Sequence, residues 1–216
     1  SLYPPLAYVN ELFSPIGISF EYCDIRYMDD PKFDDMISSI SLDNMLAMHY
    51  QVNTINLYIF NSLVHFDYGP IAGFGQYPWV QQWNQDIIAV TKDFMVGESL
   101  VFAHEMGHFF GLYHTFETEN GTELVDGSNC ETTGDLVCDT EADPLDPDDP
   151  PNVEWNMPFP DCNYSGSNTT DANGDYYIPP TDNIMSYFSW DCICRFTPQQ
   201  YNRMLEQFLL YRTNLW

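Results

Sequence analysis

Three histidines and one glutamate lie within eleven residues of this chain, the stretch "HEMGHFFGLYH" at 104–114. His104 and His108 are four residues apart, so on a helix they stand on one face, about 6 Å apart along the axis. Two imidazoles in this relation can bind one metal ion. Glu105 lies beside His104 but is rotated away from the metal, where its carboxylate can hold the reacting water instead of the ion.

Gly111 and His114 complete the pattern. Glycine tolerates the left-handed conformation that ends a helix, so the chain can turn sharply after Gly111 and bring His114 back as a third ligand. Three imidazole nitrogens and one water form an open tetrahedral zinc site, which is typical of catalytic centres. A structural zinc site usually has a fourth protein ligand, often cysteine, and this motif contains no cysteine. The pattern therefore predicts a catalytic zinc site.

The helix that must carry these side chains is predicted by the residues before and within the motif. Apolar residues recur at helical spacing through 97–113. Glu98 and Ser99 suit the helix start, because a carboxylate or hydroxyl can satisfy backbone N–H groups that have no partner within the helix.

A second clear helix is expected at 196–212, with Thr197 at the N-cap, Pro198 at the first helical position and Gln200 at the capping-box position. A weaker helical or irregular region precedes the central strands. The other expected elements are a helix at 5–13 and strands at 17–28, 54–60, 71–78 and 86–90. Glycines and a terminal proline make 71–78 an edge strand.

Length and composition favour one globular domain, since 216 residues with 44% hydrophobic and 16% aromatic content can bury a sizeable core. We expect a single catalytic domain over residues 1–216, of the α/β (α+β) class. Its upper subdomain, about 1–114, would hold a twisted mixed sheet and the motif helix. Its lower subdomain, about 115–216, would be irregular up to the C-terminal helix, and its acidic stretch "EADPLDPDDPPN" would be a solvated loop.

The charge balance argues against two classes of partner. The chain has 32 acidic and 6 basic residues, a net charge of −26, and this field repels nucleic acid and anionic membrane surfaces. No apolar run approaches the length of a membrane span. The same field favours divalent cations and could attract cationic substrates. The chain begins at Ser1 without a signal-peptide pattern, so we interpret it as a processed or trimmed product.

Six cysteines form an even set, and together with a zinc-hydrolase motif they favour disulfides in an oxidising compartment over buried free thiols. Six cysteines allow 15 pairings, which the sequence leaves open. Cys192 and Cys194 are not expected to bond to each other, because alternate residues of an extended segment share a face without approaching. We therefore expect a secreted protein.

The stretch "DNIMSYFSWDC" at 182–192 adds a second constellation. An isolated methionine in a turn, Met185, after HExxHxxGxxH resembles the metzincin metallopeptidases. More narrowly, the chain resembles the pappalysin-like group, which includes bacterial cytophagalysins. The segments that carry this resemblance are "HEMGHFFGLYHTF", "GDLVCDTEADP", "NIMSY" and "CRFTPQQYNRM". Thr115, after the third histidine, also fits this group, and the resemblance covers about residues 3–212.

The resemblance implies a role for each residue of the metal site. Glu105 would be the general base, and Met185 would form the Met-turn beneath the zinc as a structural support, a role close to that of an ordinary core methionine. The implied zinc ligands are His104, His108 and His114.

Three further features concern how a substrate would be bound and selected. Tyr187 can donate a hydrogen bond from its phenol to an oxyanion, the alternative being a packed tyrosine. Asp191 precedes Cys192 and could favour Arg or Lys just after the cut bond, although it could also cap a turn or bind calcium. An extended substrate could add to the edge strand by backbone hydrogen bonds, which favours an endopeptidase over an exopeptidase. The strand residues concerned are Ala72, Gly73, Phe74 and Gly75.

Calcium is the second expected ion. In "GDLVCDTEADP", Asp135, Asp139 and Thr140 offer hard oxygen ligands, and the resemblance implies a structural calcium site here, with the Cys138 carbonyl as a further candidate.

We therefore expect a secreted, zinc-dependent endopeptidase that acts on peptides or proteins as a monomer, with no nucleic-acid or membrane partner. The alternative is a non-catalytic, metal-stabilised binding module on the same scaffold. The intact set of three histidines and Glu105 argues against this alternative, because a purely structural metal site would not need the glutamate.

Overall fold

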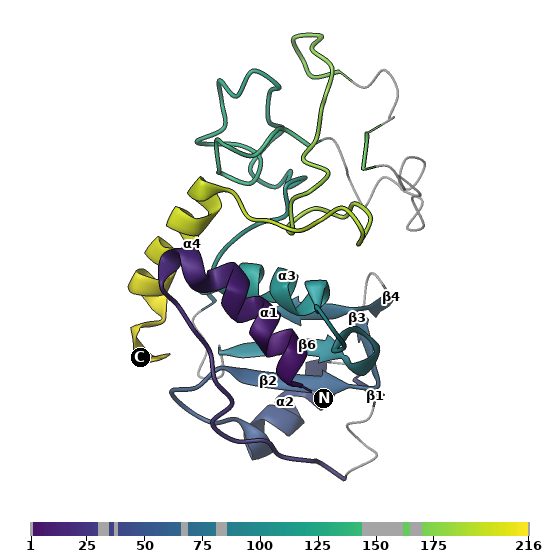
Figure 1. The fold of residues 1–216 in the computed structure, drawn as a ribbon, viewed down its shortest axis with the longest axis vertical. Helices are drawn as coiled ribbons and strands as arrows, with labels where there is room; N and C mark the ends of the chain where they lie inside the picture. Colours follow the sequence, from purple (N-terminus) through teal and green to yellow (C-terminus); the bar gives the residue numbers. More distant parts are fainter. Residues whose placement is uncertain are drawn as a thin grey trace. The chain divides into compact units, whose positions relative to one another are not determined.

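The computed structural model describes residues 2–29, 35–36, 39–65, 69–80, 86–143, 162–164 and 170–215 (Figure 1). Most of the acidic stretch expected to be a solvated loop lies outside these residues. The chain divides into two compact units, a first unit of Ser1–Gly111 with Met204–Trp216 and a second unit of Leu112–Arg203. The second unit begins near the expected boundary at about 114, whereas the end of the chain joins the first unit.

The described residues of the first unit contain six short strands in two three-stranded sheets, ordered β1-β3-β4 and β2-β6-β5. Each sheet has one parallel and one antiparallel pairing, so the expected mixed sheet is confirmed. The strands are β1 (Asp35–Met36), β2 (Asn56–Phe60), β3 (Ser62–His65), β4 (Gly69–Ile71), β5 (Gly73–Gly75) and β6 (Ile87–Thr91).

Strand β6 is the centre of its sheet. It pairs in parallel with β2, Asn56 opposite Ile87 through Phe60 opposite Thr91, and in antiparallel fashion with β5. All five residues of β6 are buried, whereas β2 alternates between buried and half-buried positions. A strand covered on both faces needs apolar residues throughout, and this explains the continuous "IIAVT" run. The strands expected at 54–60 and 86–90 are therefore confirmed.

The expected N-terminal helix forms as α1 (Tyr3–Phe13), followed by the short 3₁₀ helix η1 (Ser14–Ile16). The strand expected at 17–28 is wrong, because the described chain there has no regular structure. The side chain of Asn10 takes the place of a strand partner: its Oδ1 accepts from the N–H of Phe20 at 2.6 Å, and its Nδ2 donates to the carbonyl of Phe20 at 2.9 Å. The Phe20 ring then packs 5.3 Å from the ring of Phe13.

Three further helical segments lie among the described residues between η1 and Gly111. They are α2 (Ser39–His49), the short 3₁₀ helix η2 (Lys92–Phe94) and α3 (Leu100–Phe109), which carries the histidine motif. Helix α2 buries Met45 and Leu46 in a core with Tyr58 and Phe60. No helix in the described part of the chain is long and apolar enough to cross a membrane.

The second unit is built almost entirely from turns, as the sequence predicts. Among its described residues, the only regular elements are isolated bridges and the start of α4 (Pro198–Tyr211). Two disulfides cross-link it, Cys130–Cys138 and Cys162–Cys192. The predicted disulfides are thus confirmed for four cysteines, and Cys192 does not pair with Cys194. Cys194 and Cys23 are free and exposed, so the expectation of a complete disulfide set is wrong for this pair.

Helix α4 begins with the capping box that the sequence predicts. The N–H of Gln200 donates to Thr197 Oγ1 at 3.1 Å, and the N–H of Thr197 donates to Gln200 Oε1 at 2.9 Å. The last residues of α4 and the 3₁₀ helix η3 (Thr213–Leu215) return to the first unit. There the Phe208 ring packs 5.7 Å from that of Phe110, and Arg212 forms a buried ion pair with Asp86.

Candidate active site

Helix α3 holds the first two histidines on one face. Ser99 caps the helix as predicted, because its hydroxyl oxygen accepts from the N–H of Phe102 at 3.2 Å. His104 and His108 are both buried, and their ring centroids are 4.7 Å apart with the ring planes nearly perpendicular. The two imidazoles are therefore close enough to bind one ion.

Gly111 ends the helix in the way that the sequence predicts. Its φ is +87°, a left-handed conformation, and its N–H donates to the carbonyl of His108 at 2.8 Å. A Cβ at Gly111 would lie 2.7 Å from the side chain of Gln207, so the position also has no room for one.

The turn leaves His104, His108 and His114 with ligand nitrogens all within 4.8 Å of one another. Three nitrogens around one tetrahedral zinc ion lie roughly 3.3 Å apart. His104 and His108 are buried and His114 is half-buried. The donor set therefore fits a catalytic zinc ion.

Glu105 is buried against the backbone of strand β5. A Cβ at Gly73 would lie 2.9 Å from Cγ and 3.0 Å from Oε1 of Glu105, and a Cβ at Gly75 would overlap the carbonyl of Glu105. The two glycines of "GFG" thus let the strand lie directly on the helix. Burial is the main cause that raises the pKa of Glu105 to about 8, and a hydrogen bond from the N–H of Gly75 lowers this pKa in part.

Strand β5 pairs with β6 only, among the described residues, so it is the edge strand that the sequence predicts. The carbonyl of Ala72 accepts from Thr91 and the N–H of Gln76 donates to Ile87, so these groups face β6. By alternation, the backbone groups of Gly73 and Gly75 face away from β6. All four predicted edge residues, Ala72, Gly73, Phe74 and Gly75, lie in or beside this strand.

Met185 and Tyr187 share one turn of the second unit. The Met185 side chain is fully buried, and its N–H donates to Asn183 Oδ1 at 2.8 Å. Tyr187 is 37% exposed, and its ring centroid lies 4.8 Å from that of His114. The phenol is therefore partly open to solvent beside the third histidine.

Sequence reasoning missed a buried carboxylate that ties this turn to the residue after His114. Asp143 Oδ2 accepts from the hydroxyl of Thr115 at 2.7 Å and from that of Ser186 at 3.1 Å, and all three residues are buried. The N–H of Thr115 also donates to the carbonyl of Met185 at 3.2 Å. The only signal for Asp143 was its place at the end of "GDLVCDTEADP", which gives no partner.

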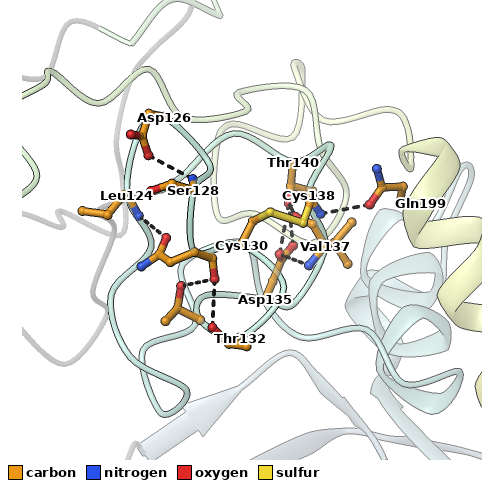
Figure 2. The surroundings of a disulfide bond; sticks show 12 residues. Leu124, Asp126, Ser128, Cys130, Thr132, Asp135, Val137, Cys138, Thr140 and Gln199 are labelled. Atoms are coloured by element: carbon orange, nitrogen blue, oxygen red, sulfur yellow. Dashed lines mark hydrogen bonds between the residues drawn. A yellow bond between two sulfur atoms is a disulfide. The ribbon is translucent and has the colours of Figure 1, made fainter.

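The residues predicted to bind calcium lie close to one disulfide (Figure 2). Asp135 accepts from the hydroxyl of Thr140 at 3.0 Å and from the N–H of Val137 at 3.0 Å, and both Asp135 and Thr140 are buried. The Cys138 sulfur bonds to Cys130, so only the Cys138 carbonyl could serve an ion.

A second buried carboxylate near Asp135 was not predicted. Glu123 is 6% exposed, and a Cβ at Gly134 would overlap its carboxylate. Burial raises the pKa of Asp135 to about 8 and that of Glu123 to about 7, and the charge of Glu123 further raises the pKa of Asp135.

Asp191 lies on the surface of the second unit. It is exposed, and its N–H donates to Ser189 Oγ at 3.4 Å. The neighbouring Cys192 is bonded to Cys162.

The family model described as "Peptidase_M43: Pregnancy-associated plasma protein-A" matches residues 41–209, which is more than half of the chain. The chain belongs to the peptidase M43 family. The resemblance to pappalysin-like metzincins is therefore confirmed, and the protein is a zinc metalloendopeptidase by family.

Relatives and solved structures agree with this assignment. An extracellular metalloprotease of Colletotrichum graminicola is 26% identical over 219 residues, 96% of this chain and 67% of the relative. Human pappalysin-1 is 30% identical over 143 residues, 62% of this chain and 8% of pappalysin-1. Several fungal relatives are named extracellular metalloproteases, and this agrees with the expected secreted location.

Two structures of mirolysin share the fold. One, in complex with compound 9, has a TM-score of 0.53 at 20% identity and covers 81% of this chain and 61% of mirolysin. The other, mature mirolysin of Tannerella forsythia with a cleaved peptide, has a TM-score of 0.50 at 19% identity and covers 80% of this chain and 61% of that one. The chain therefore spans less than two thirds of the mirolysin chains.

Proposed function

We propose that this chain hydrolyses peptide bonds within extended protein or peptide substrates, with zinc held by His104, His108 and His114. The observation that carries the proposal is the approach of the three ligand nitrogens to within 4.8 Å, with Glu105 buried beside the first of them on α3. Zinc, when bound, supplies a water of lowered pKa and polarises the substrate carbonyl. The remaining steps belong to side chains of this chain.

Glu105 acts as the general base. Its carboxylate takes a proton from the attacking water and later delivers that proton to the leaving amine. The surroundings of Glu105 suit this exchange, because the N–H of Gly75 holds the carboxylate in place beside His104. A non-catalytic module would have no use for a buried glutamate at this position, and this favours the enzyme over the binding module.

Tyr187 donates a hydrogen bond from its phenol to the oxyanion that forms as the carbonyl is attacked. Support comes from its partial exposure and from the contact of its ring with His114. Met185 supports the same turn from within the core and does not bind the metal. The hydroxyls of Thr115 and Ser186 both donate to the carboxylate of Asp143, and these bonds restrain the backbone next to His114 and next to Met185.

The substrate lies extended along β5, the described edge of its sheet, and adds a strand by backbone hydrogen bonds. The N–H of Gly75 is already used by Glu105, so the substrate pairs with the remaining outward groups of Gly73 and Gly75. Mature mirolysin, which shares the fold, has been captured with a cleaved peptide.

Two finer features complete the proposal. Asp191 favours Arg or Lys just after the cut bond, by a charge-assisted hydrogen bond of roughly 1.5–3 kcal/mol. Calcium binds the oxygens of Asp135 and Thr140 with the Cys138 carbonyl, and the buried carboxylate of Glu123 adds a candidate ligand. The functional form is a monomer, and its single catalytic domain comprises both units.

Cleavage of a peptide mixture with and without a zinc chelator tests the proposal. We expect hydrolysis to stop on chelation and to return when zinc is restored, with internal cut sites identified by mass spectrometry. A chain that binds zinc at the three histidines but cleaves no peptide in the library would support the binding module instead.

A further inference from the structure

Arg212 is the largest fully buried side chain described, with no exposed surface at all. A buried guanidinium is costly unless its donors are satisfied, and here each nitrogen has a partner. Nε donates to the carbonyl of Phe109 at 3.0 Å, one terminal nitrogen pairs with the carboxylate of Asp86, and the other donates to the carbonyl of Gln76 at 2.6 Å. One planar group thus joins the end of α3, the residue after β5 and the residue before β6.

The partners of Arg212 are themselves fixed. Asp86 also accepts from the phenol of Tyr50 at 3.2 Å and from Asn214 Nδ2 at 3.1 Å. The guanidinium carbon lies 3.6 Å from the centroid of the Phe109 ring, a cation–π contact. A lysine could pair with Asp86, but its single ammonium could not hold two carbonyls in this planar geometry.

Two of these partners are next to residues of the active site. Phe109 directly follows His108. Gln76 directly precedes Tyr77, and the Tyr77 ring lies edge-on to the His108 imidazole, with 5.2 Å between centroids. The Tyr77 ring is also stacked on that of Trp79, with 4.6 Å between centroids. His108 is therefore packed against a side chain whose backbone is anchored by Arg212.

We propose that Arg212 is a positioning residue of the metal centre, which holds Phe109 and Gln76 so that Tyr77 keeps the His108 imidazole in its ligand orientation. The proposal rests on the proposed role of His108 as a zinc ligand. An imidazole that is already restrained loses less freedom when the metal binds, so the restraint raises metal affinity. A role in packing alone would change stability and leave the zinc affinity of the folded protein unchanged.

The test is the zinc dissociation constant of the metal-free protein, measured by competition with a chromophoric chelator. We expect Arg212→Met to weaken zinc binding by about 10- to 100-fold, the usual effect of losing a supporting residue around a ligand, and Arg212→Lys to weaken it less. Tyr77→Leu should weaken binding in the parent protein but add little in Arg212→Met, since both act on His108. Arg26→Met is the matched control, because Arg26 forms an exposed ion pair with Asp24 in the same unit and should leave affinity unchanged.

The outcomes separate this inference from the proposed function. A parent protein that does not bind zinc contradicts the proposed function itself. A parent that binds zinc, with equal affinity in a folded Arg212→Met, overturns only the role of Arg212. If circular dichroism shows that the methionine variant is unfolded, Arg212→Lys decides by the same criterion. Failure of both variants to fold would assign Arg212 to the fold and overturn a specific role at the metal centre.

Discussion

In the first unit, β6 is buried along its whole length between β2 and β5, and pairing with both neighbours satisfies its backbone polar groups. In the second unit, backbone hydrogen bonds within turns and individual side chains together satisfy such groups. Asn129 accepts from the N–H of Leu124 at 2.8 Å, and Asp171 accepts from the N–H groups of Asn173 and Asp175 at 2.8 and 3.0 Å. Two disulfides add covalent links.

The two units therefore support different parts of the proposed active site. A sheet and its helix hold Glu105, His104 and His108 on rigid elements, where the chemistry needs the greatest precision. The turn-rich second unit carries Tyr187 and Asp191, which face the substrate in our proposal. The first unit should therefore depend on packing, and the second on cross-links and ions. The following predictions test this contrast.

The largest effect is expected in the core of the first unit. Ile88 has no exposed surface and lies in β6, opposite Leu57 of β2. Ile88→Ala should lower the free energy of unfolding by about 4 kcal/mol, because it removes buried methyl groups and leaves a cavity. Denaturant unfolding measures this loss. Ile25→Ala is the control, since Ile25 is 44% exposed and should change stability by less than about 0.5 kcal/mol. Equal losses in both variants would contradict a packed first unit.

Removing the Cys162–Cys192 disulfide should produce a nearly equal loss in the second unit. The bond closes a loop with a sequence separation of 30, which corresponds to about 3–4 kcal/mol of chain entropy. Replacing both cysteines with alanine should increase hydrogen exchange throughout the second unit and leave β2 and β6 protected. A variant with uniform exchange changes across both units would show that they are not stabilised separately.

Calcium removal should have a smaller effect on the same unit. Asp135 and Glu123 are buried carboxylates whose negative charges repel each other, and a divalent cation would offset that repulsion. Calcium at 100 times its dissociation constant should stabilise the fold by about 2.7 kcal/mol, seen as a rise in melting temperature. Asp135→Asn should keep its hydrogen-bond geometry but lose the response. An unchanged melting temperature on adding a calcium-selective chelator, with zinc retained, counts against the site.

The smallest effect is expected in substrate preference. Asp191→Ala should reduce the preference for Arg or Lys just after the cut bond by about 10- to 100-fold while sparing the hydrolysis of other peptides. Glu206, an exposed acidic residue on α4, provides a control in Glu206→Ala. A cleavage profile with hydrophobic residues at this position would refute the assignment and leave the protease itself unaffected.

Residues close together in the sequence predicted the helix boundaries and the metal-ligand motif. Ser99, Thr197 and Gln200 mark helix starts by hydrogen bonds within three residues, and Gly111 marks a helix end by its backbone freedom. The histidine motif places its own ligands because the helix and its terminal turn fix their spacing.

Long-range partners explain what sequence alone missed. The alternation at 17–28 suggested a strand, but the side chain of Asn10 satisfies the backbone of Phe20 instead. Asp143 acts on Thr115, 28 residues earlier, and Arg212 acts on Gln76, 136 residues earlier. No local pattern records such pairings, because they depend on how the whole chain folds back on itself.

The most direct test of the central claim is Glu105→Ala, with zinc content and peptide hydrolysis measured on the same sample. Glu105 is proposed to move protons and not to bind the metal. We therefore predict near-stoichiometric zinc together with a fall in hydrolysis of several orders of magnitude, whereas His114→Ala should lower zinc occupancy. Loss of zinc from Glu105→Ala, or hydrolysis at the parent rate with zinc in place, would contradict this account.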